Sequence, residues 1–98
     1  MTSKQRAKFR SQANRIEPLF QVGKSGVGDT LIKQTDEALT ARELIKLRVL
    51  LETAPEKPKE IAVKLAEATG SEVIGVIGGS IILYRYNEQL HKKDNKKK

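Results

Sequence analysis

The stretch LFQVGKSGVGDTLIKQTDEALTARELIKLRVL, residues 19–50, decides the fold. Its first four residues, Leu19 to Val22, are mostly apolar and predict a short strand that leads into a glycine loop. A helical pattern follows over residues 30–41, and residues 44–51 alternate in a way that predicts a second strand. A strand–helix–strand unit of this length predicts a parallel pair joined by a right-handed crossover.

The alternation within residues 44–51 assigns two faces to the second strand. One face is wholly apolar and is the expected core face: Ile45, Leu47, Val49 and Leu51. The other carries Lys46 and Arg48, where water or a polyanion can reach them. Asp29 is a plausible N-cap for the preceding helix, although that helix could also begin nearer Gly26.

The flanking residues extend this unit on both sides. Residues 4–16 predict a helix, because Phe9, Ala13 and Ile16 form one apolar stripe. Pro18 ends that pattern. On the other side, Pro58 and Gly70 suit the start and the stop of a third helix. Two strands, over residues 72–77 and 81–86, then flank Gly78-Gly79, which favours a tight hairpin turn.

These elements together predict one α/β domain over residues 1–90. Their order is α-β-α-β-α-β-β, which is that of a two-layer sandwich with a small mixed four-stranded sheet. The helices are expected to cover one face of the sheet and leave the other partly open. Residues 91–98 contain five lysines, and we expect them to be a disordered tail.

Positive charge gathers at the two ends of the chain. The net charge of the 98 residues is +7, yet residues 1–15 alone carry five cations and no acid. This asymmetry predicts an anionic partner, most simply nucleic acid, although the lysines of the tail could equally serve solubility. With no cysteine, no apolar stretch long enough for a membrane and no signal-peptide pattern, a cytoplasmic monomer is expected.

The glycine loop is the strongest candidate site. Gly23 and Gly26 flank Lys24 and Ser25. A backbone rich in glycine allows close approach of a ligand, and KH-type modules clamp nucleotide backbones with a G-x-x-G loop. The alternative is an ordinary strand-to-helix turn, since many surface turns have this spacing. Lys24 at the tip, the helix that follows and the basic helix that precedes the loop favour binding.

Catalytic patterns are missing from the sequence. Pro18 stands where a P-loop needs its first glycine, so Gly23-Lys24-Ser25 does not complete a nucleotide-binding motif. His91 is the only histidine, and Asp36 and Glu37 are adjacent on a helix and do not converge. We therefore expect no enzyme activity, cofactor, metal or small-molecule substrate.

Aromatic residues make up 4% of the chain. Tyr84 and Tyr86 alternate with Arg85 and could stack on bases from an open sheet. The stronger interpretation is that Ile82, Tyr84 and Tyr86 share one face and complete the core, with Arg85 exposed. Phe9 and Phe20 also have the spacing of core residues, so affinity for a nucleic acid would depend on charge and shape.

Three segments together resemble a known family. They are Gln21–Gly26, the run RELIKLRVL at residues 42–50, and Leu83-Tyr84-Arg85. They are similar to the CRM domain in its stand-alone bacterial YhbY form, over about residues 2–87. The resemblance implies an RNA-binding module with a fold similar to that of the C-terminal domain of translation initiation factor 3. It also implies that the glycine loop contacts RNA and that the protein is associated with precursors of the large ribosomal subunit.

The sequence thus predicts a protein that binds ribosomal RNA during assembly of the large subunit. In this prediction the glycine turn and the cationic first helix together hold a ribose-phosphate chain. The residues expected to contact RNA are Gly23, Lys24, Ser25, Gly26, Arg6, Lys8, Arg10 and Arg15, with Lys46 and Arg48 as weaker candidates. The alternative is a protein-interaction module that docks on a ribosomal or assembly protein through apolar surface and tolerates salt.

Overall fold

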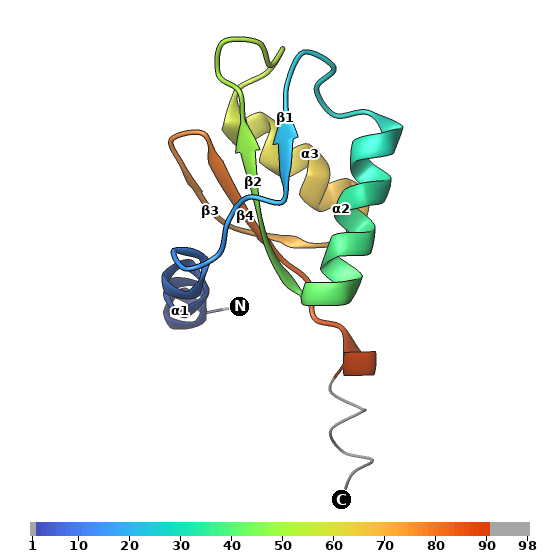
Figure 1. Cartoon of the computed structure of the whole chain (residues 1–98). Helices are drawn as coiled ribbons and strands as arrows, with labels where there is room; N and C mark the ends of the chain where they lie inside the picture. Colours follow the sequence, from blue (N-terminus) through green and yellow to red (C-terminus); the bar gives the residue numbers. More distant parts are fainter. Residues whose placement is uncertain (1, 91–98) are drawn as a thin grey trace, which may run out of the picture.

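The computed structural model describes residues 2–90. Its elements are α1 (Ser3–Ala13), β1 (Phe20–Val22), α2 (Asp29–Arg42), β2 (Leu44–Val49), α3 (Pro58–Thr69), β3 (Glu72–Ile77) and β4 (Ser80–Tyr84) (Figure 1). A single helical turn follows at residues 88–90. The predicted α/β class and element order are confirmed. The expected disordered tail, residues 91–98, lies outside the described residues.

The four strands form one mixed sheet in the order β1-β2-β4-β3. β1 pairs with β2 in parallel, whereas β4 pairs with both β2 and β3 in antiparallel fashion. The predicted parallel pair and the C-terminal hairpin are therefore both present. The hairpin places β4 between β2 and β3, so that these two strands run in the same direction without being neighbours (Figure 1).

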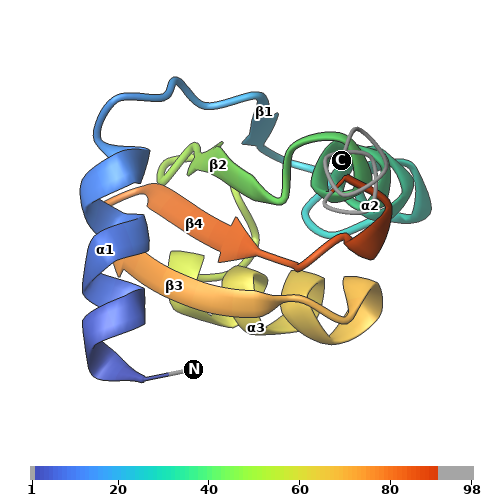
Figure 2. The same ribbon diagram turned by 90° about the horizontal axis from the view of Figure 1, so that it is seen from below.

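The main core lies between the sheet and the two helices α2 and α3, which cover one face (Figure 2). Ile45, Leu47 and Val49 of β2 point into it as predicted, with exposed fractions of 0%, 0% and 3%. Leu39 of α2 and Leu65 of α3 are fully buried against them. This burial of aliphatic side chains supplies the main driving force for folding.

Helix α1 lies on the opposite face of the sheet (Figure 2). Its predicted stripe of Phe9, Ala13 and Ile16 packs there against Ile74 of β3 and Ile82 of β4. The expectation that the helices share one face is therefore wrong for α1. The reason is that the outer face of β3 and β4 carries its own apolar residues, which need a cover as much as the stripe does.

Several element boundaries differ from the sequence pattern. α1 ends at Ala13 and not at residue 16, and β4 ends at Tyr84 and not at residue 86. β2 ends at Val49, and Leu51, expected in the core, is 64% exposed in the following turn. The strand stops because β1 is short: the Leu50 N–H donates to the Val22 carbonyl (2.9 Å), at the last residue of β1. At the start of α2 the N-cap is Gly28, so Asp29 lies in the first turn of the helix and does not cap it.

The hairpin between β3 and β4 needs both of its glycines. Gly78 has a φ of +58°, which favours glycine. A Cβ on Gly79 would lie 2.8 Å from the Val49 carbonyl oxygen, because the backbones of β2 and the hairpin meet there. The Val49 N–H donates to the Gly79 carbonyl across the same contact, at 2.6 Å.

Candidate nucleic-acid interface

The turn Gly23–Gly26 follows β1 and presents its two central residues to solvent. The Gly26 N–H donates to the Gly23 carbonyl at 3.0 Å, which closes the turn. Gly26 is buried, has a φ of +61°, and lies so close to Pro55 that a Cβ would be 2.8 Å from its Cγ. Lys24 and Ser25 are exposed at the tip. The turn is thus fixed at Gly26 and exposed to solvent at Lys24 and Ser25.

The tip has polar groups to offer an anion. Neither Lys24 nor Ser25 makes a hydrogen bond or an ion pair with any other residue between 2 and 90. Their N–H groups, the Ser25 hydroxyl and the Lys24 ammonium therefore point to water. The N-terminus of α2 attracts an anion less strongly than a helix N-terminus usually does, because Asp29 places a carboxylate in its first turn.

The turn and the basic helix do not lie side by side. In Figure 1 the turn is at the upper end of the sheet, with the loop after β2 and the β3–β4 hairpin, whereas α1 lies at the lower end. The contacts of α1 are with the outer face of β2, β3 and β4. The turn and α1 therefore do not form one continuous binding site, as the sequence analysis expects them to.

The cations of α1 and its C-terminal extension face solvent around the apolar stripe. Lys8, Arg10 and Arg15 are exposed, and Arg6 is half-buried. The stem of Arg10 lies over Gly75 of β3, where a Cβ would be 3.1 Å from Arg10 Cδ. Within the described part of the chain the Arg6 Nε is buried without a hydrogen-bond partner.

Lys46 and Arg48 occupy the outer face of β2 between these two regions. Lys46 Nζ donates to the Ala13 carbonyl at the end of α1 (3.4 Å). Arg48 is exposed and lies opposite Gln21 of β1 and Ser80 of β4. From residue 46 to residue 50 an extended strand covers about 13 Å. These two side chains therefore connect the end of α1 to the neighbourhood of the turn.

None of the candidate cations is neutralised by an acid in the region that the structure describes. The ion pairs found there are Lys64–Glu56 and Arg85–Asp36, on other surfaces. Lys46 and Arg48 are the weaker candidates in the sequence, because acids of the body could pair with them, yet neither forms an ion pair within residues 2–90. Unpaired surface cations are the electrostatic footprint of a protein that binds a polyanion.

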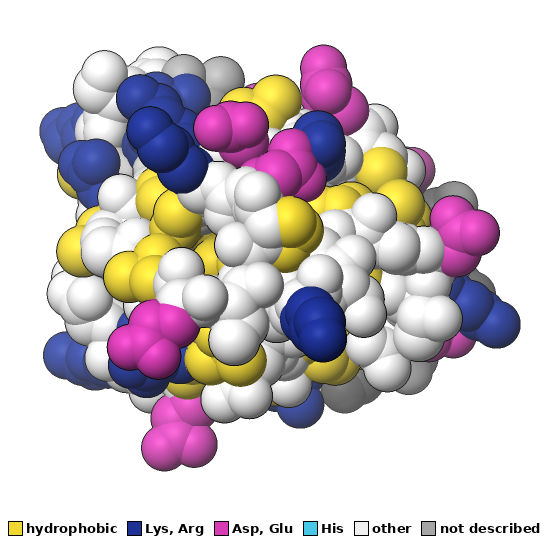
Figure 3. Space-filling view, turned by 90° about the horizontal axis from the view of Figure 1, so that it is seen from above, with side chains coloured by type: hydrophobic (Ala, Val, Ile, Leu, Met, Phe, Trp, Pro, Cys, Tyr) yellow, Lys and Arg dark blue, Asp and Glu magenta, His cyan; other side chains and the backbone are white. Residues whose placement is uncertain are grey.

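The end of the molecule that carries the turn also exposes apolar side chains. Leu50 and Leu51 are 37% and 64% exposed, and Ile77 at the hairpin is 59% exposed. Figure 3 looks onto this end and shows hydrophobic side chains at the surface among separated cations and acids. The sequence analysis does not predict this feature, because the alternation of β2 places Leu51 in the core and no pattern indicates that Ile77 is exposed.

Tyr84 is not available to stack on a base. Its ring stacks on Phe9 of α1, with 4.2 Å between ring centroids and 25° between planes. Burial raises the pKa of the Tyr84 hydroxyl above its usual value, and the nearby charges of Glu43 and Tyr86 add to the increase. The interpretation of Tyr84 as part of the core is therefore correct. The same interpretation is wrong for Tyr86, which is 57% exposed, and for Arg85, whose side chain is only 22% exposed.

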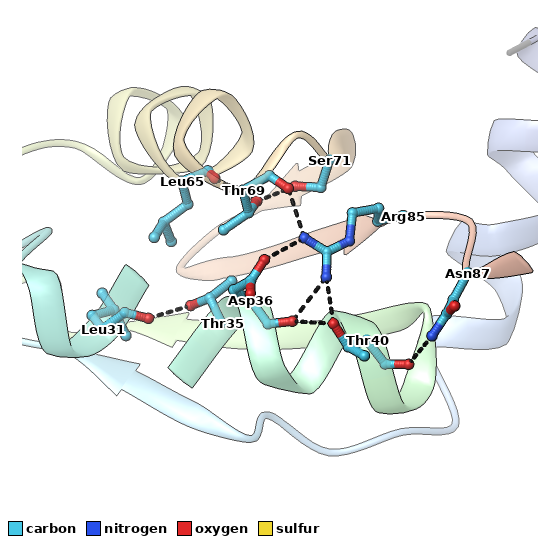
Figure 4. Close-up of polar contacts among 9 residues, drawn as sticks. All are labelled: Leu31, Thr35, Asp36, Thr40, Leu65, Thr69, Ser71, Arg85 and Asn87. Atoms are coloured by element: carbon cyan, nitrogen blue, oxygen red, sulfur yellow. Dashed lines mark hydrogen bonds and ion pairs between the residues drawn. The ribbon is translucent and has the colours of Figure 1, made fainter. Parts of the chain in front are cut away.

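Arg85 has a structural role (Figure 4). Its Nη1 donates to Asp36 Oδ1 (2.5 Å) and to the Thr69 carbonyl (2.7 Å), and its Nη2 donates to the Asp36 carbonyl (2.9 Å) and Thr40 Oγ1 (2.7 Å). One guanidinium thus joins the chain after β4 to α2 and to the last residue of α3. Asn87 continues this contact with α2, donating to the Thr40 carbonyl.

No helix within residues 2–90 combines the length and the apolar character that crossing a bilayer requires.

The chain matches known proteins over nearly its whole length. It is 43% identical over 89 residues to "Probable RNA-binding protein YqeI" of Bacillus subtilis (strain 168), covering 91% of this chain and 92% of that protein. It is 38% identical over 102 residues to "Probable RNA-binding protein MJ0652" of Methanocaldococcus jannaschii, covering 99% and 75% of the two chains.

A solved structure shows the same fold. The solution structure of the hypothetical protein SAV1595 from Staphylococcus aureus superposes with a TM-score of 0.75 and is 47% identical, covering 89% of this chain and 90% of that one. The family model of the CRS1 / YhbY (CRM) domain matches residues 1–85, which include the glycine turn, α1 and the whole sheet. The chain therefore belongs to the CRS1 / YhbY (CRM) domain family.

Proposed function

We propose that the chain binds ribosomal RNA during assembly of the large ribosomal subunit. The observation that carries the proposal is a series of unpaired cations that runs from α1, past Lys46 and Arg48 on β2, to Lys24 at the turn. The two relatives described above are named RNA-binding proteins, which supports RNA as the partner. The association with large-subunit precursors follows from the resemblance to the YhbY form.

The two ends of this surface have different parts in the proposed contact. At the turn, the N–H groups of Lys24 and Ser25 and the Lys24 ammonium hold a phosphate at close range. At α1 the side chains of Lys8, Arg10 and Arg15 attract the same polyanion over a wider area. Arg48 lies between the two, on the open part of the sheet. Such contacts are made with the backbone and shape of the RNA more than with base edges.

The change Lys24→Gln tests the turn. Loss of one phosphate contact is expected to weaken binding of a labelled ribosomal RNA fragment several-fold and to reduce the salt slope of log K by about 0.7. The measurement is a fluorescence anisotropy titration at several salt concentrations. The control is Lys59→Gln, since Lys59 is exposed on α3, on the other face of the sheet, and should leave both values unchanged. Equal effects of the two changes would refute a role for the turn.

Crosslinking in cells tests the choice of RNA. With the tagged full-length protein, sequencing of the crosslinked RNA is expected to return large-subunit ribosomal RNA, and the protein should sediment with precursors of that subunit. Crosslinks spread over messenger or transfer RNA would contradict the ribosomal assignment. Binding to ribosomal proteins that persists after RNA digestion and at high salt would support the alternative, a protein-interaction module.

A further inference from the structure

A shallow hollow lies on the β4 side of Leu50, the residue that also touches the glycine turn. It has a volume of about 320 Å³ and is lined by Arg48, Val49, Leu50, Leu51, Glu52, Gly79 and Ser80. The residues come from the end of β2, the turn after it and the start of β4. The charged and hydroxyl side chains of Arg48, Glu52 and Ser80 accompany the apolar surface of the two leucines.

The leucines are held in place by the backbone. The Leu50 N–H donates to the Val22 carbonyl (2.9 Å), and the Leu50 carbonyl accepts from the N–H groups of Thr53 (3.0 Å) and Ala54 (2.9 Å). Leu50 also touches the turn, since a Cβ on Gly23 would lie 3.5 Å from its Cδ1. On the other side, a Cβ on Gly79 would lie 3.7 Å from Leu51 Cγ. The apolar surface is thus preformed and adjoins both the turn and the hairpin.

The chemistry of the hollow does not suit a phosphate. Arg48 and Ser80 can donate hydrogen bonds, but the two exposed leucines offer none and the Glu52 carboxylate would repel a phosphate. A neutral, flat group with apolar faces and a polar edge suits it better. Such a group can lie on Leu50 and Leu51 while Arg48, Ser80 and Glu52 provide donors and acceptors for its edge.

We propose that this hollow holds an unpaired nucleobase of an RNA strand whose phosphates lie on the Gly23–Gly26 turn. The inference depends on the proposed RNA binding and makes it more specific: the ligand is a single-stranded segment or loop. Bases in a duplex are stacked and paired, so they cannot lie flat on the leucines. The Tyr84 ring is stacked on Phe9, whereas the aliphatic side chains of Leu50 and Leu51 are exposed near the turn.

A tryptophan reporter provides the direct test, because the chain has no tryptophan of its own. Leu51→Trp changes a side chain that is 64% exposed, and Val63→Trp, on α3, is the matched control at 49%. An unstructured single-stranded RNA is expected to quench the fluorescence of the Leu51→Trp protein at saturation and to leave the control unchanged. A duplex of the same sequence should cause no quenching, since its bases are not free.

Affinity provides a second test in which the side chain is made polar at nearly the same size. Leu51→Asn is expected to weaken binding of the single strand roughly fivefold, through lost apolar contact, with the salt slope unchanged. An abasic strand of the same length has phosphates but no bases, and it should bind wild type and Leu51→Asn equally. This pattern is the reverse of that expected for Lys24→Gln, which lowers the slope.

The outcomes separate this inference from the proposal on which it depends. If Lys24→Gln weakens RNA binding while Leu51→Asn and the Leu51→Trp fluorescence show no response, the nucleobase site is overturned and RNA binding stands. If neither Lys24→Gln nor Leu51→Asn affects RNA binding, the proposed RNA contact at this end fails as a whole. If the Leu51→Trp fluorescence responds to purified ribosomal proteins and not to RNA, the hollow is a protein-docking surface, and the nucleobase assignment is wrong.

Discussion

The two glycines of the turn have different physical roles. Gly26 combines a φ of +61° with a position against the Pro55 ring, so both the backbone and the space around it exclude a side chain. Gly23 is outside the left-handed region, and a Cβ there would make ordinary contacts with Leu50 and Thr53. The fold therefore requires glycine at position 26 but not at position 23.

Gly26→Ala is accordingly expected to destabilise the protein, by about 1 to 3 kcal/mol, through backbone strain and the contact with Pro55. Gly23→Ala should change the free energy of unfolding by no more than about 0.5 kcal/mol. Urea unfolding of the two variants beside wild type measures both values. Equal losses of stability would contradict this account of the turn. A binding defect of a Gly26 variant is informative only once its folding has been checked.

At the scale of elements, the C-terminal ends of α2 and α3 are joined through Arg85. Both helices end beside the chain that leaves β4: Glu43, with a φ of +67°, follows α2, and Gly70 follows α3. The Glu43 carbonyl accepts from the Arg85 N–H at 2.9 Å, and its carboxylate accepts from the Asn87 N–H at 2.7 Å. Arg85 is one of the residues on which the resemblance to the family depends. Its hydrogen bonds explain its presence by a structural role that does not involve RNA.

Arg85→Lys tests this role, because an ammonium cannot reproduce the planar fork that reaches four acceptors. The free energy of unfolding is expected to fall by about 1 to 3 kcal/mol, measured by thermal or urea denaturation. Asp36→Asn is the comparison and should cost less, about 0 to 1 kcal/mol, since its carboxylate is 54% exposed. RNA affinity should be unchanged below the unfolding transition. A loss of RNA affinity with full stability would instead place Arg85 in the interface.

Sequence patterns predicted these elements well where local rules decide them. The period-two alternation of β2 identified Ile45, Leu47 and Val49 as core, because side chains alternate along any strand. The same pattern failed at Leu51, since the end of β2 depends on where its neighbour β1 stops. The stripe of α1 was predicted, but the face that it covers depends on Ile74 and Ile82, which in the sequence are indistinguishable from core residues of the other face.

For the candidate site, the sequence predicted an exposed turn and unpaired cations but not their arrangement. The exposure of Lys24 follows from a glycine-flanked turn between two elements, which is a local property. The separation of the turn from α1 depends on the path of residues 14–19 around the edge of the sheet, which no spacing rule specifies. The hollow at Leu50 and Leu51 depends on contacts between two segments that are distant in sequence, residues 48–52 and 79–80.

For the molecule as a whole, the charge is distributed along an extended body. The principal extents are 50 × 28 × 21 Å. The cations of α1 and β2 lie on the outer face of the sheet, and Lys24 lies at the end of the sheet that carries the turn. An RNA that follows this surface contacts several phosphates in succession, and each neutralised phosphate releases counterions. The affinity therefore reports on the number of contacts through its dependence on salt.

Raising the salt concentration from about 0.05 M to 0.2 M is expected to weaken binding of a single-stranded ribosomal RNA fragment roughly 300-fold if about six phosphates are neutralised. The combined change Lys8→Gln and Arg15→Gln should reduce the slope by about 1.4, twice the effect of Lys24→Gln alone. Anisotropy titrations over a salt series measure these slopes. An affinity that stays constant over this range would favour docking through apolar surface.

Gly75 has a consequence for the seating of the first helix. Arg10 crosses β3 where the strand has no side chain, and a methyl group at that position would meet Arg10 Cδ at 3.1 Å and Cγ at 3.4 Å. A larger residue at position 75 would push the Arg10 stem outward by a few tenths of an ångström or more. Because β3 has no side chain at this point, the stem can lie flat on an edge strand, and this contact fixes where the positive charge of Arg10 is presented.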